Sequence, residues 1–230
     1  MKLARALLLA TLEDLITQRA PAAGAWLGEI PTEDGEPEAF VQAVAGAPRA
    51  VGRSALALDR EEAARLRGLG VTWSLARWAI DDLARAAVLM RAGSVLPPGG
   101  FEAVVDRAYH AGDQRQQQAV LRALPLLPYP DRFIGLGTEA VRAGNVPIFE
   151  AIACENPFPA AHFPSMNFNH MVLAALVTGV ALDRVVGLGA RVTPELVRMA
   201  NDYAAERRAA GRSVPADLDY ITESARVVAA

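Results

Sequence analysis

The sequence predicts an all-α protein in which irregular HEAT-like helical hairpins stack as a short solenoid, with a compact multi-helix bundle as the alternative. Apolar residues recur at helical spacing along the chain, whereas the alternating pattern of strands is almost missing. Hydrophobic residues make up 52% of the sequence but aromatic residues only 6%, a composition typical of helices that pack closely through small side chains. No strict period of about 40 residues repeats, so the hairpins are expected to be irregular.

The N-terminal segment predicts an amphipathic helix. Its apolar run after Arg5 superficially resembles a signal peptide, but Glu13 and Asp14 interrupt the run and no small-x-small cleavage site follows at once. One helical face carries Leu8, Leu12, Leu15 and Ile16. The following segment, Pro21 to Pro37, is expected to be a loop because its second half is polar and rich in turn-forming residues.

Three helices are expected in the next part of the chain. The first covers residues 38–45 and ends at Gly46 and Pro48, and the second covers residues 59–67, with Asp59 as N-cap. The clearest helix opens at Thr72 and stops at Gly93. Its apolar stripe consists of Trp73, Ala76, Ile80, Leu83, Ala87 and Met90. A different face carries Arg77, Asp81 and Arg85, which are expected to form solvated ion pairs.

Short helices joined by polar or proline-rich links are expected from there to the C-terminus. The cap residues predicted from their types are Asp113, Asp131 and Thr193 at N-termini and Gly112, Gly179 and Gly211 at C-termini. The predicted helices cover residues 100–112, 114–124, 132–143, 147–156, 165–179 and 194–211, followed by a last helix from residues 213–217 toward Ala230. The four glutamines at 114 and 116–118 are expected to form a solvated face.

Composition and charge exclude several function classes. The formal net charge of −3 gives no basic footprint for nucleic acid. The single cysteine, Cys154, cannot form an internal disulfide and is expected to be a buried packing residue. No apolar stretch approaches the roughly 20 residues that a membrane span requires. The protein is therefore predicted to be cytoplasmic, with at most peripheral membrane association.

The most unusual segment is residues 154–171, where amides, imidazoles and prolines are concentrated. Prolines restrict the residues before them, so we expect a well-defined extended turn that holds polar groups in place. The candidate ligand-binding residues are Glu155, Asn156, His162, Asn167, Asn169 and His170. Neutral amide and imidazole groups suit either an uncharged polar ligand or the bracing of a loop, and the sequence leaves both open.

Other chemistries find little support. His162 and His170, taken with Cys154, Glu155 or Asp219, match no metal-ligand spacing, so no metal site is predicted. The Gly-Leu-Gly segments at 135–137 and 187–189 do not follow strands or complete a dinucleotide motif, and Lys2 is the only lysine. No cofactor is therefore expected.

Three stretches carry a resemblance to a known family: CENPFPAAHFPSMNFNHMVLAAL at 154–176, the turn at 179–191, and PELVRMANDYAAERRAAGRSVPADL at 194–218. In this combination the sequence resembles the EboA-like family, which implies one all-helical EboA-like domain over 1–230, with an N-terminal helical part at 1–70 and a core bearing the family motifs at 71–230. The resemblance adds Pro157, Arg212, Ser213 and Asp217 as signature positions of unknown role, and it implies no catalytic residue.

The resemblance implies a role in metabolite traffic, in which a precursor of a secondary metabolite is moved toward the cell envelope. Family members occur in gene clusters with a UbiA-type prenyltransferase, which is therefore an implied partner. The leading hypothesis is a non-enzymatic binding or scaffold component of such a pathway. The alternatives are an enzyme acting on a small metabolite through Glu155, His162 or His170, and a purely structural protein–protein interaction module.

Overall fold

The computed structural model describes residues 2–228, and in this range the fold is all-α, as predicted. These residues form helices and no β-strand, apart from one isolated antiparallel bridge between Ala55 and Ala79. The chain divides into two compact units, residues 1–136 (unit 1) and residues 137–230 (unit 2). The stacking of hairpins into a solenoid stays a prediction.

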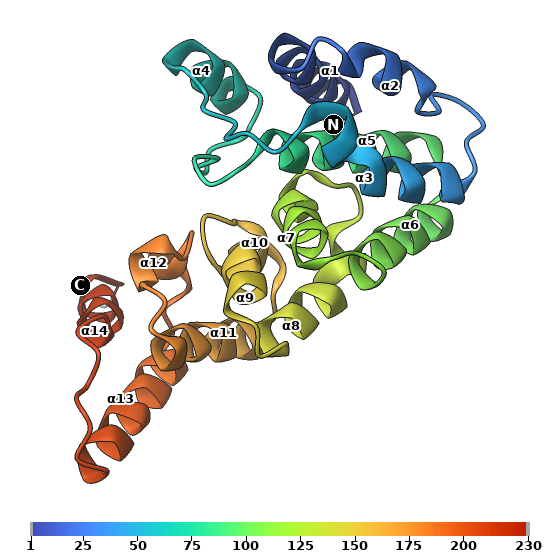
Figure 1. The fold of residues 1–230 in the computed structure, drawn as a ribbon. Helices are drawn as coiled ribbons and strands as arrows, with labels where there is room; N and C mark the ends of the chain where they lie inside the picture. The colour runs from blue at the N-terminus through green and yellow to red at the C-terminus, as the bar shows by residue number, and fades with distance from the viewer. Residues whose placement is uncertain (1, 229–230) are drawn as a thin grey trace. The chain divides into compact units, whose positions relative to one another are not determined.

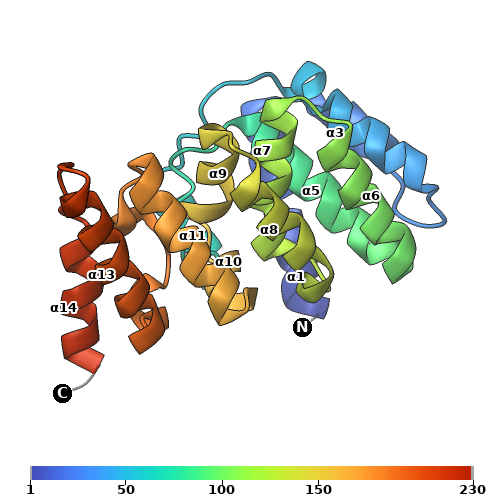
Figure 2. The same cartoon turned by 90° about the horizontal axis from the view of Figure 1, so that it is seen from below.

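Unit 1 is built around one central helix (Figures 1 and 2). The helix α5 contacts α1, α3, α6 and α7, and α3 and α7 also contact α6. The elements of unit 1 are α1 (Lys2–Arg19), α2 (Ala23–Glu29), α3 (Pro37–Val51), α4 (Arg60–Gly68), α5 (Ile80–Val95), α6 (Pro98–His110), α7 (Gln114–Ala123), the 3-10 helices η1 (Leu124–Leu126) and η2 (Pro130–Phe133), and the start of α8 (Ile134–Arg142).

Unit 2 continues from α8 through further helices, and its last two, α13 and α14, lie side by side (Figure 2). Its α11 contacts α9, α13 and η3, and thereby links the early and late parts of the unit. The further elements of unit 2 are α9 (Val146–Ala153), α10 (Phe158–His162), α11 (Ser165–Thr178), η3 (Leu182–Arg184), α12 (Leu188–Arg191), α13 (Pro194–Ala209) and α14 (Leu218–Val228). The predicted end of the last helix at Ala230 lies outside the described residues. Between Lys2 and Val228, each helix is too short or too polar to cross a membrane.

The central helix α5 is buried on all sides, including three charged side chains. Asp81, Asp82 and Arg85 are each at most 5% exposed. A helix enclosed on every face cannot leave its charged residues in water, so each must find an internal partner. The prediction that Asp81 and Arg85 form a solvated pair is therefore wrong in its solvation: they form a buried pair, 2.7 Å between Nη1 and Oδ2.

The buried pair also repairs a defect in α3. Pro48 lies inside α3, where its ring nitrogen has no hydrogen to donate to the carbonyl of Val44, four residues earlier. The Arg85 Nε donates to that carbonyl at 3.2 Å. The predicted helix end at Gly46 and Pro48 is therefore wrong, because α3 continues to Val51 with a tertiary hydrogen bond in place of the missing local one.

The segment before α5 is not helical, so the predicted helix start at Thr72 is also wrong. Residues 71–79 take an irregular path that two hydrogen bonds tie to residues 54–56: Leu56 N to the Trp78 carbonyl and Ile80 N to the Ser54 carbonyl, both 2.9 Å. The carboxylate of Asp82 accepts the Ala79 N–H at 2.8 Å and thereby caps the helix. Burial raises the pKa of Asp82, while Arg122 opposes that shift.

Four other predictions fail for tertiary reasons. The segment 21–37 contains a helix, α2, which buries Ala23 and Leu27. Gly93 lies inside α5 instead of ending it. A Cβ at this position would meet the Pro128 ring at 2.5 Å, so the glycine allows close packing. Gln116 is not solvated, since it is buried and donates to the Ala108 carbonyl. The predicted helix from Arg132 is a 3-10 turn followed by α8, and Asp131 lies inside that turn.

The local end signals are otherwise confirmed. The side chains of Asp59, Asp113 and Thr193 each accept a backbone N–H at the predicted helix start. At the predicted helix ends, Gly179 and Gly211 adopt positive φ, as C-terminal glycines do. These signals act within a few residues, so tertiary packing leaves them unchanged.

We expect Arg85→Met to destabilise the protein by about 3–5 kcal/mol, because it leaves the Asp81 carboxylate buried and unpaired and the Val44 carbonyl without a donor. Denaturant unfolding followed by circular dichroism measures the change. Arg65→Met is the matched control: its pair with Asp14 is half exposed and should contribute less than about 1 kcal/mol. Adding Pro48→Ala to Arg85→Met should recover about 1 kcal/mol by returning a local donor. Equal losses at Arg85 and Arg65 would contradict the assignment.

Candidate functional site

The predicted polar segment begins with a strained residue held by an arginine. Glu155 has a φ of 47°, a left-handed conformation that is uncommon outside glycine. Its carboxylate accepts two hydrogen bonds from Arg184, at 2.8 and 3.0 Å, and its backbone N–H donates to the Arg184 carbonyl. These hydrogen bonds raise the pKa of the Arg184 guanidinium further above its usual range. Glu150 accepts from the same guanidinium, so the arginine joins α9 to η3.

Asn156 holds the next turn. Its side-chain oxygen accepts the Phe158 N–H at 3.0 Å, and its amide donates to the Ala151 carbonyl at 3.0 Å. The expectation of an extended turn is wrong in part, because Phe158–His162 forms the short helix α10. Prolines at the first positions of a helix are compatible with helical φ, so Pro159 sits in the first turn of α10 without strain. Cys154 is buried, as predicted.

The three candidate residues on α11 point to different neighbours. Asn167 and His170 line a hollow of about 220 Å³ between α8 and α11, together with Thr138, Val141, Arg142 and Ala174. Asn169 is buried, and its amide nitrogen lies 3.9 Å from the Met199 sulfur on α13. Its side-chain oxygen has no hydrogen-bond partner within the described residues. Residues two apart on a helix point in different directions, and the face with Asn167 and His170 lines a hollow.

The remaining candidate positions are engaged in packing or in turns. The His162 ring contacts the Phe158 ring at 5.0 Å between centroids. Pro157 precedes α10 as its N-cap residue. Gly137 lies against Phe163, whose ring would meet an added Cβ at 2.9 Å, so this Gly-Leu-Gly segment serves close helix packing. Among the residues described, no three potential metal-ligating His, Cys, Asp or Glu side chains come together.

The signature positions near the C-terminus form a helix-ending motif. The Arg212 N–H donates to the Arg207 carbonyl and the Gly211 N–H to the Arg208 carbonyl, the pair of bonds that defines a Schellman motif. The Arg207 guanidinium donates to the Ser213 carbonyl at 2.6 Å. Asp217 accepts the backbone N–H of Leu182 at 2.7 Å and so ties the start of α14 to η3. These contacts position the last helix.

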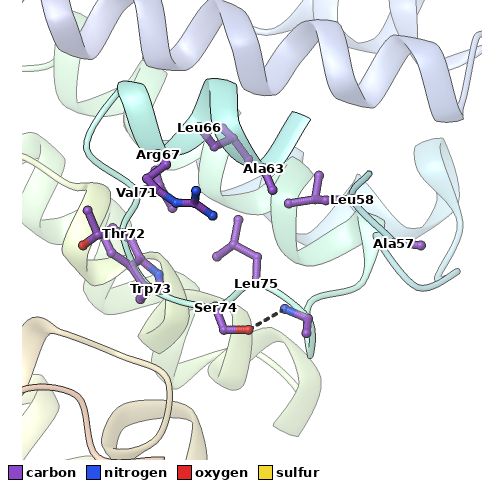
Figure 3. A pocket seen from close by; sticks show the side chains of 11 residues that line it. Ala57, Leu58, Ala63, Leu66, Arg67, Val71, Thr72, Trp73, Ser74 and Leu75 are labelled. Atoms are coloured by element: carbon purple, nitrogen blue, oxygen red, sulfur yellow. Dashed lines mark hydrogen bonds between the residues drawn. The ribbon is translucent and has the colours of Figure 1, made fainter. Parts of the chain in front are cut away.

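A larger hollow, which we call the α4 pocket, lies in unit 1 between α4 and the irregular segment before α5 (Figure 3). Its volume is about 520 Å³, within the range of ligand-binding sites. The lining is mainly apolar, with one charged side chain, Arg67, and one aromatic side chain, Trp73. The lining residues are Ala57, Leu58, Ala63, Leu66, Arg67, Val71, Thr72, Trp73, Ser74, Leu75 and Ala76.

One arginine braces the wall of the α4 pocket from α1. Arg19 donates to both carboxylate oxygens of Glu62 on α4, at 3.0 and 2.6 Å, and to the carbonyls of Leu56 and Ala57. Ala57 has a φ of 43°, so this arginine also holds a strained residue at the pocket edge. The hydrogen bond from Arg19 lowers the pKa of Glu62. The pocket walls are thus fixed although they are not helical.

The α4 pocket was missed from sequence because its walls come from a segment predicted to be helical. The signal that could have revealed it is Gly70, which adopts a φ of 97° and ends the regular structure after α4. Unit 1 also contains a hollow of about 550 Å³ between α1, the end of α5 and Pro128–Pro130, which we call the α1 pocket. Loops positioned by a rigid scaffold are the usual place for binding residues, and this favours the α4 pocket.

We expect Arg184→Met to destabilise unit 2 by about 2 kcal/mol, because two charge-assisted hydrogen bonds to Glu155 are lost while the strained backbone remains. The Arg184 side chain is 18% exposed. Arg198→Met, which removes an exposed arginine that pairs with Glu195 and Asp202, should leave the unfolding midpoint unchanged. If both variants lowered the unfolding midpoint by a similar amount, the Arg184 pairs would be ordinary surface contacts.

We also expect the Glu62–Arg19 contact to make stability depend on pH. The pKa of Glu62 in the folded protein lies below its usual value of 4.5. Its contribution is therefore complete above that value and is lost as the pH falls through the lowered folded-state pKa. Unfolding measured from neutral to acid pH should show wild type more stable than Glu62→Gln at neutral pH, with the difference in unfolding free energy shrinking as the pH falls below 4.5. A gap that does not depend on pH would contradict this account.

Comparison with known families gives one match. The profile of the family described as metabolite traffic protein EboA matches residues 6–223, nearly the whole chain and well beyond the three stretches that carried the resemblance. No curated protein and no solved structure matched. The match includes the whole α4 pocket and all candidate residues from 155 to 170. The chain belongs to the EboA family of metabolite traffic proteins.

Proposed function

We propose that this protein acts without catalysis by binding a small-molecule metabolite in the α4 pocket. The carrying observation is the pocket itself: it has a volume of about 520 Å³, most of its lining residues are apolar, and Arg67 is its single charged side chain. Ligand sites combine apolar walls with a few placed polar groups, which is the composition of this lining. The family description, metabolite traffic, supports a small molecule as the occupant.

The rigid attachment of the pocket walls supports binding. The segment 71–79 is fixed at one end by the bridge between Ala55 and Ala79 and at the other by the Val71 N–H, which donates to the Leu66 carbonyl. A preorganised wall loses little conformational freedom when a ligand binds, so more of the contact energy appears as affinity. An irregular segment held this firmly is consistent with a site that keeps its shape without a ligand.

The hollow on α11 is a second candidate site and continues the expectation for residues 154–170. Asn167 and His170 line it with Arg142, so its polar groups suit a small polar ligand. We place it second because it is less than half the volume of the α4 pocket. In this proposal Glu155, Asn156 and Asn169 hold the surrounding backbone in place and do not contact the ligand. Their partners are Arg184, the Phe158 N–H and Met199 on α13, respectively.

The geometry gives less support to the two other functions, an enzyme and a purely structural module. An enzyme acting through Glu155, His162 or His170 needs a carboxylate and an imidazole that converge on one substrate. Glu155 instead binds Arg184, His162 packs on Phe158, and His170 lies on the face of α11 toward the hollow. A purely structural interaction module would need no pocket, whereas the α4 pocket is large enough to hold a ligand.

Proposals about the pathway, the cell compartment and the partner enzyme follow from the family description and from the apolar lining residues. We propose that the bound metabolite is a precursor in a secondary-metabolite pathway, that the protein works in the cytoplasm, and that a UbiA-type prenyltransferase receives or supplies the ligand. An apolar pocket suits a molecule that must be kept from water between a pathway enzyme and a membrane. Binding of the purified prenyltransferase to this protein, measured by surface plasmon resonance, tests the partner separately.

The pocket assignment is tested by filling it. We expect Ala63→Trp to weaken binding of the neutral apolar dye N-phenylnaphthylamine at least tenfold, because the indole would occupy the space between α4 and the segment 71–76. Fluorescence titration measures the affinity. Ala64→Trp adds the same ring to the exposed side of the same helix and should bind the dye as wild type does.

A third variant distinguishes the two large hollows. Ala6→Trp places the ring at the α1 pocket, whose lining includes Ala6. Loss of dye binding in Ala6→Trp but not in Ala63→Trp would move the site to the α1 pocket. A wild-type protein that binds no dye would contradict the proposal of an accessible apolar site.

A further inference from the structure

The ligand class can be argued from the one charged side chain in the α4 pocket. Arg67 is exposed and lines the pocket, and Figure 3 shows its guanidinium directed into the space between α4 and the segment carrying Leu75. Within residues 2–228 the structure gives this guanidinium no carboxylate partner. An arginine presents five donors in a planar fork that matches carboxylate and phosphate oxygens.

The neighbouring charges do not neutralise this arginine. Arg65, two residues earlier on α4, pairs with Asp14 at 3.0 Å, and Glu62 is bound by Arg19 at 2.6 Å. Asp14 on α1 and Glu62 on α4 are thus each paired with another arginine. The pocket lining contains no acidic residue, so an anion placed at Arg67 would meet no opposing negative charge there.

The other walls accept an apolar body. Leu58, Leu66, Val71 and Leu75 supply aliphatic surface, and the half-buried Trp73 adds a broad aromatic surface. The hydroxyl of Ser74 accepts the Ala76 N–H at 3.2 Å, so this polar group is partly satisfied within its own turn. A ligand that covers these walls gains by removing apolar surface from water.

We propose that the α4 pocket selects an amphipathic organic anion, with a carboxylate or phosphate head on Arg67 and an apolar body against Trp73 and the aliphatic walls. This inference rests on the proposed function and names the ligand class of the same site. Trp73 and Val71 also line a second hollow of about 240 Å³ next to α1.

The test compares four compounds that share a ten-carbon chain and differ in the head group. Decanoate, decyl phosphate, decanol and decyltrimethylammonium each displace N-phenylnaphthylamine from the protein, and displacement is followed by fluorescence. For wild type we expect both anions to displace the dye at about tenfold lower concentration than decanol, because an arginine–oxyanion hydrogen bond is charge-assisted. Decyltrimethylammonium should be the weakest. The order of decanoate and decyl phosphate then distinguishes a carboxylate head from a phosphate head.

Variants assign the preference to Arg67. Arg67→Gln should remove the difference between the concentrations at which the anions and decanol displace the dye. Arg67→Lys should keep part of the preference, since the charge remains but the planar fork is lost. Arg65→Gln is the matched control on the same helix and should keep the full tenfold difference.

The outcomes separate this inference from the proposed function. If decanol displaces the dye as well as the anions do, or if Arg65→Gln lowers the anion preference as much as Arg67→Gln, the anion inference is overturned. The pocket assignment survives that result as long as Ala63→Trp still removes dye binding. If Ala63→Trp leaves all displacement unchanged, the proposed function itself is wrong.

Discussion

The buried contact of Arg85 with Asp81 and with the Val44 carbonyl is the interaction on which unit 1 depends. It is the point where α3 and α5 are joined by polar chemistry as well as by packing. Burying an ion pair is costly, and here one oxygen of Asp81 also lacks a hydrogen-bond partner within the described residues. The compensating gain is structural: Arg85 replaces the donor that Pro48 removes, and α3 can therefore run its full length along α5.

The position of the α4 pocket follows from the same helix. The helix α5 is enclosed from its first turn, and residues 71–79 lead into it at Ile80 as an irregular segment. The Asp82 cap and the bridge between Ala55 and Ala79 fix the end of that segment. Arg19 fixes the opposite wall through Glu62. The pocket is thus a consequence of how the chain enters the central helix.

Sequence reasoning recovered what is decided locally and missed what is decided by distant partners. The caps at Asp59, Asp113 and Thr193 and the left-handed Gly211 depend on neighbours within a few residues, and all were predictable. The continuation of α3 through Pro48 depends on Arg85, 37 residues later, and no pattern in the residues around Pro48 predicts this contact. The α4 pocket was missed for the same reason, since its walls depend on hydrogen bonds between residues 54–56 and residues 78–80, which are distant in sequence.

The segment 154–171 was conspicuous in sequence for a related reason. Unusual composition marks any site where the backbone is strongly constrained, whether by a ligand or by the fold. Glu155 and Asn156 are now accounted for by Arg184 and by the turn into α10, and Arg212, Ser213 and Asp217 by the end of α13 and the placement of α14. Asn167 and His170 instead line a hollow next to α8.

A protein that moves metabolites must bind its ligand and also release it, and the chemistry of the α4 pocket suits that requirement. A fully buried, unpaired arginine would hold an anion tightly but would be costly in the empty protein. Arg67 is instead exposed, so water solvates it in the empty protein and its contribution to affinity stays modest. The apolar walls then supply most of the affinity and the arginine supplies selectivity. Release to a partner then requires that the partner replace the arginine contact and also cover the apolar surface that the ligand leaves.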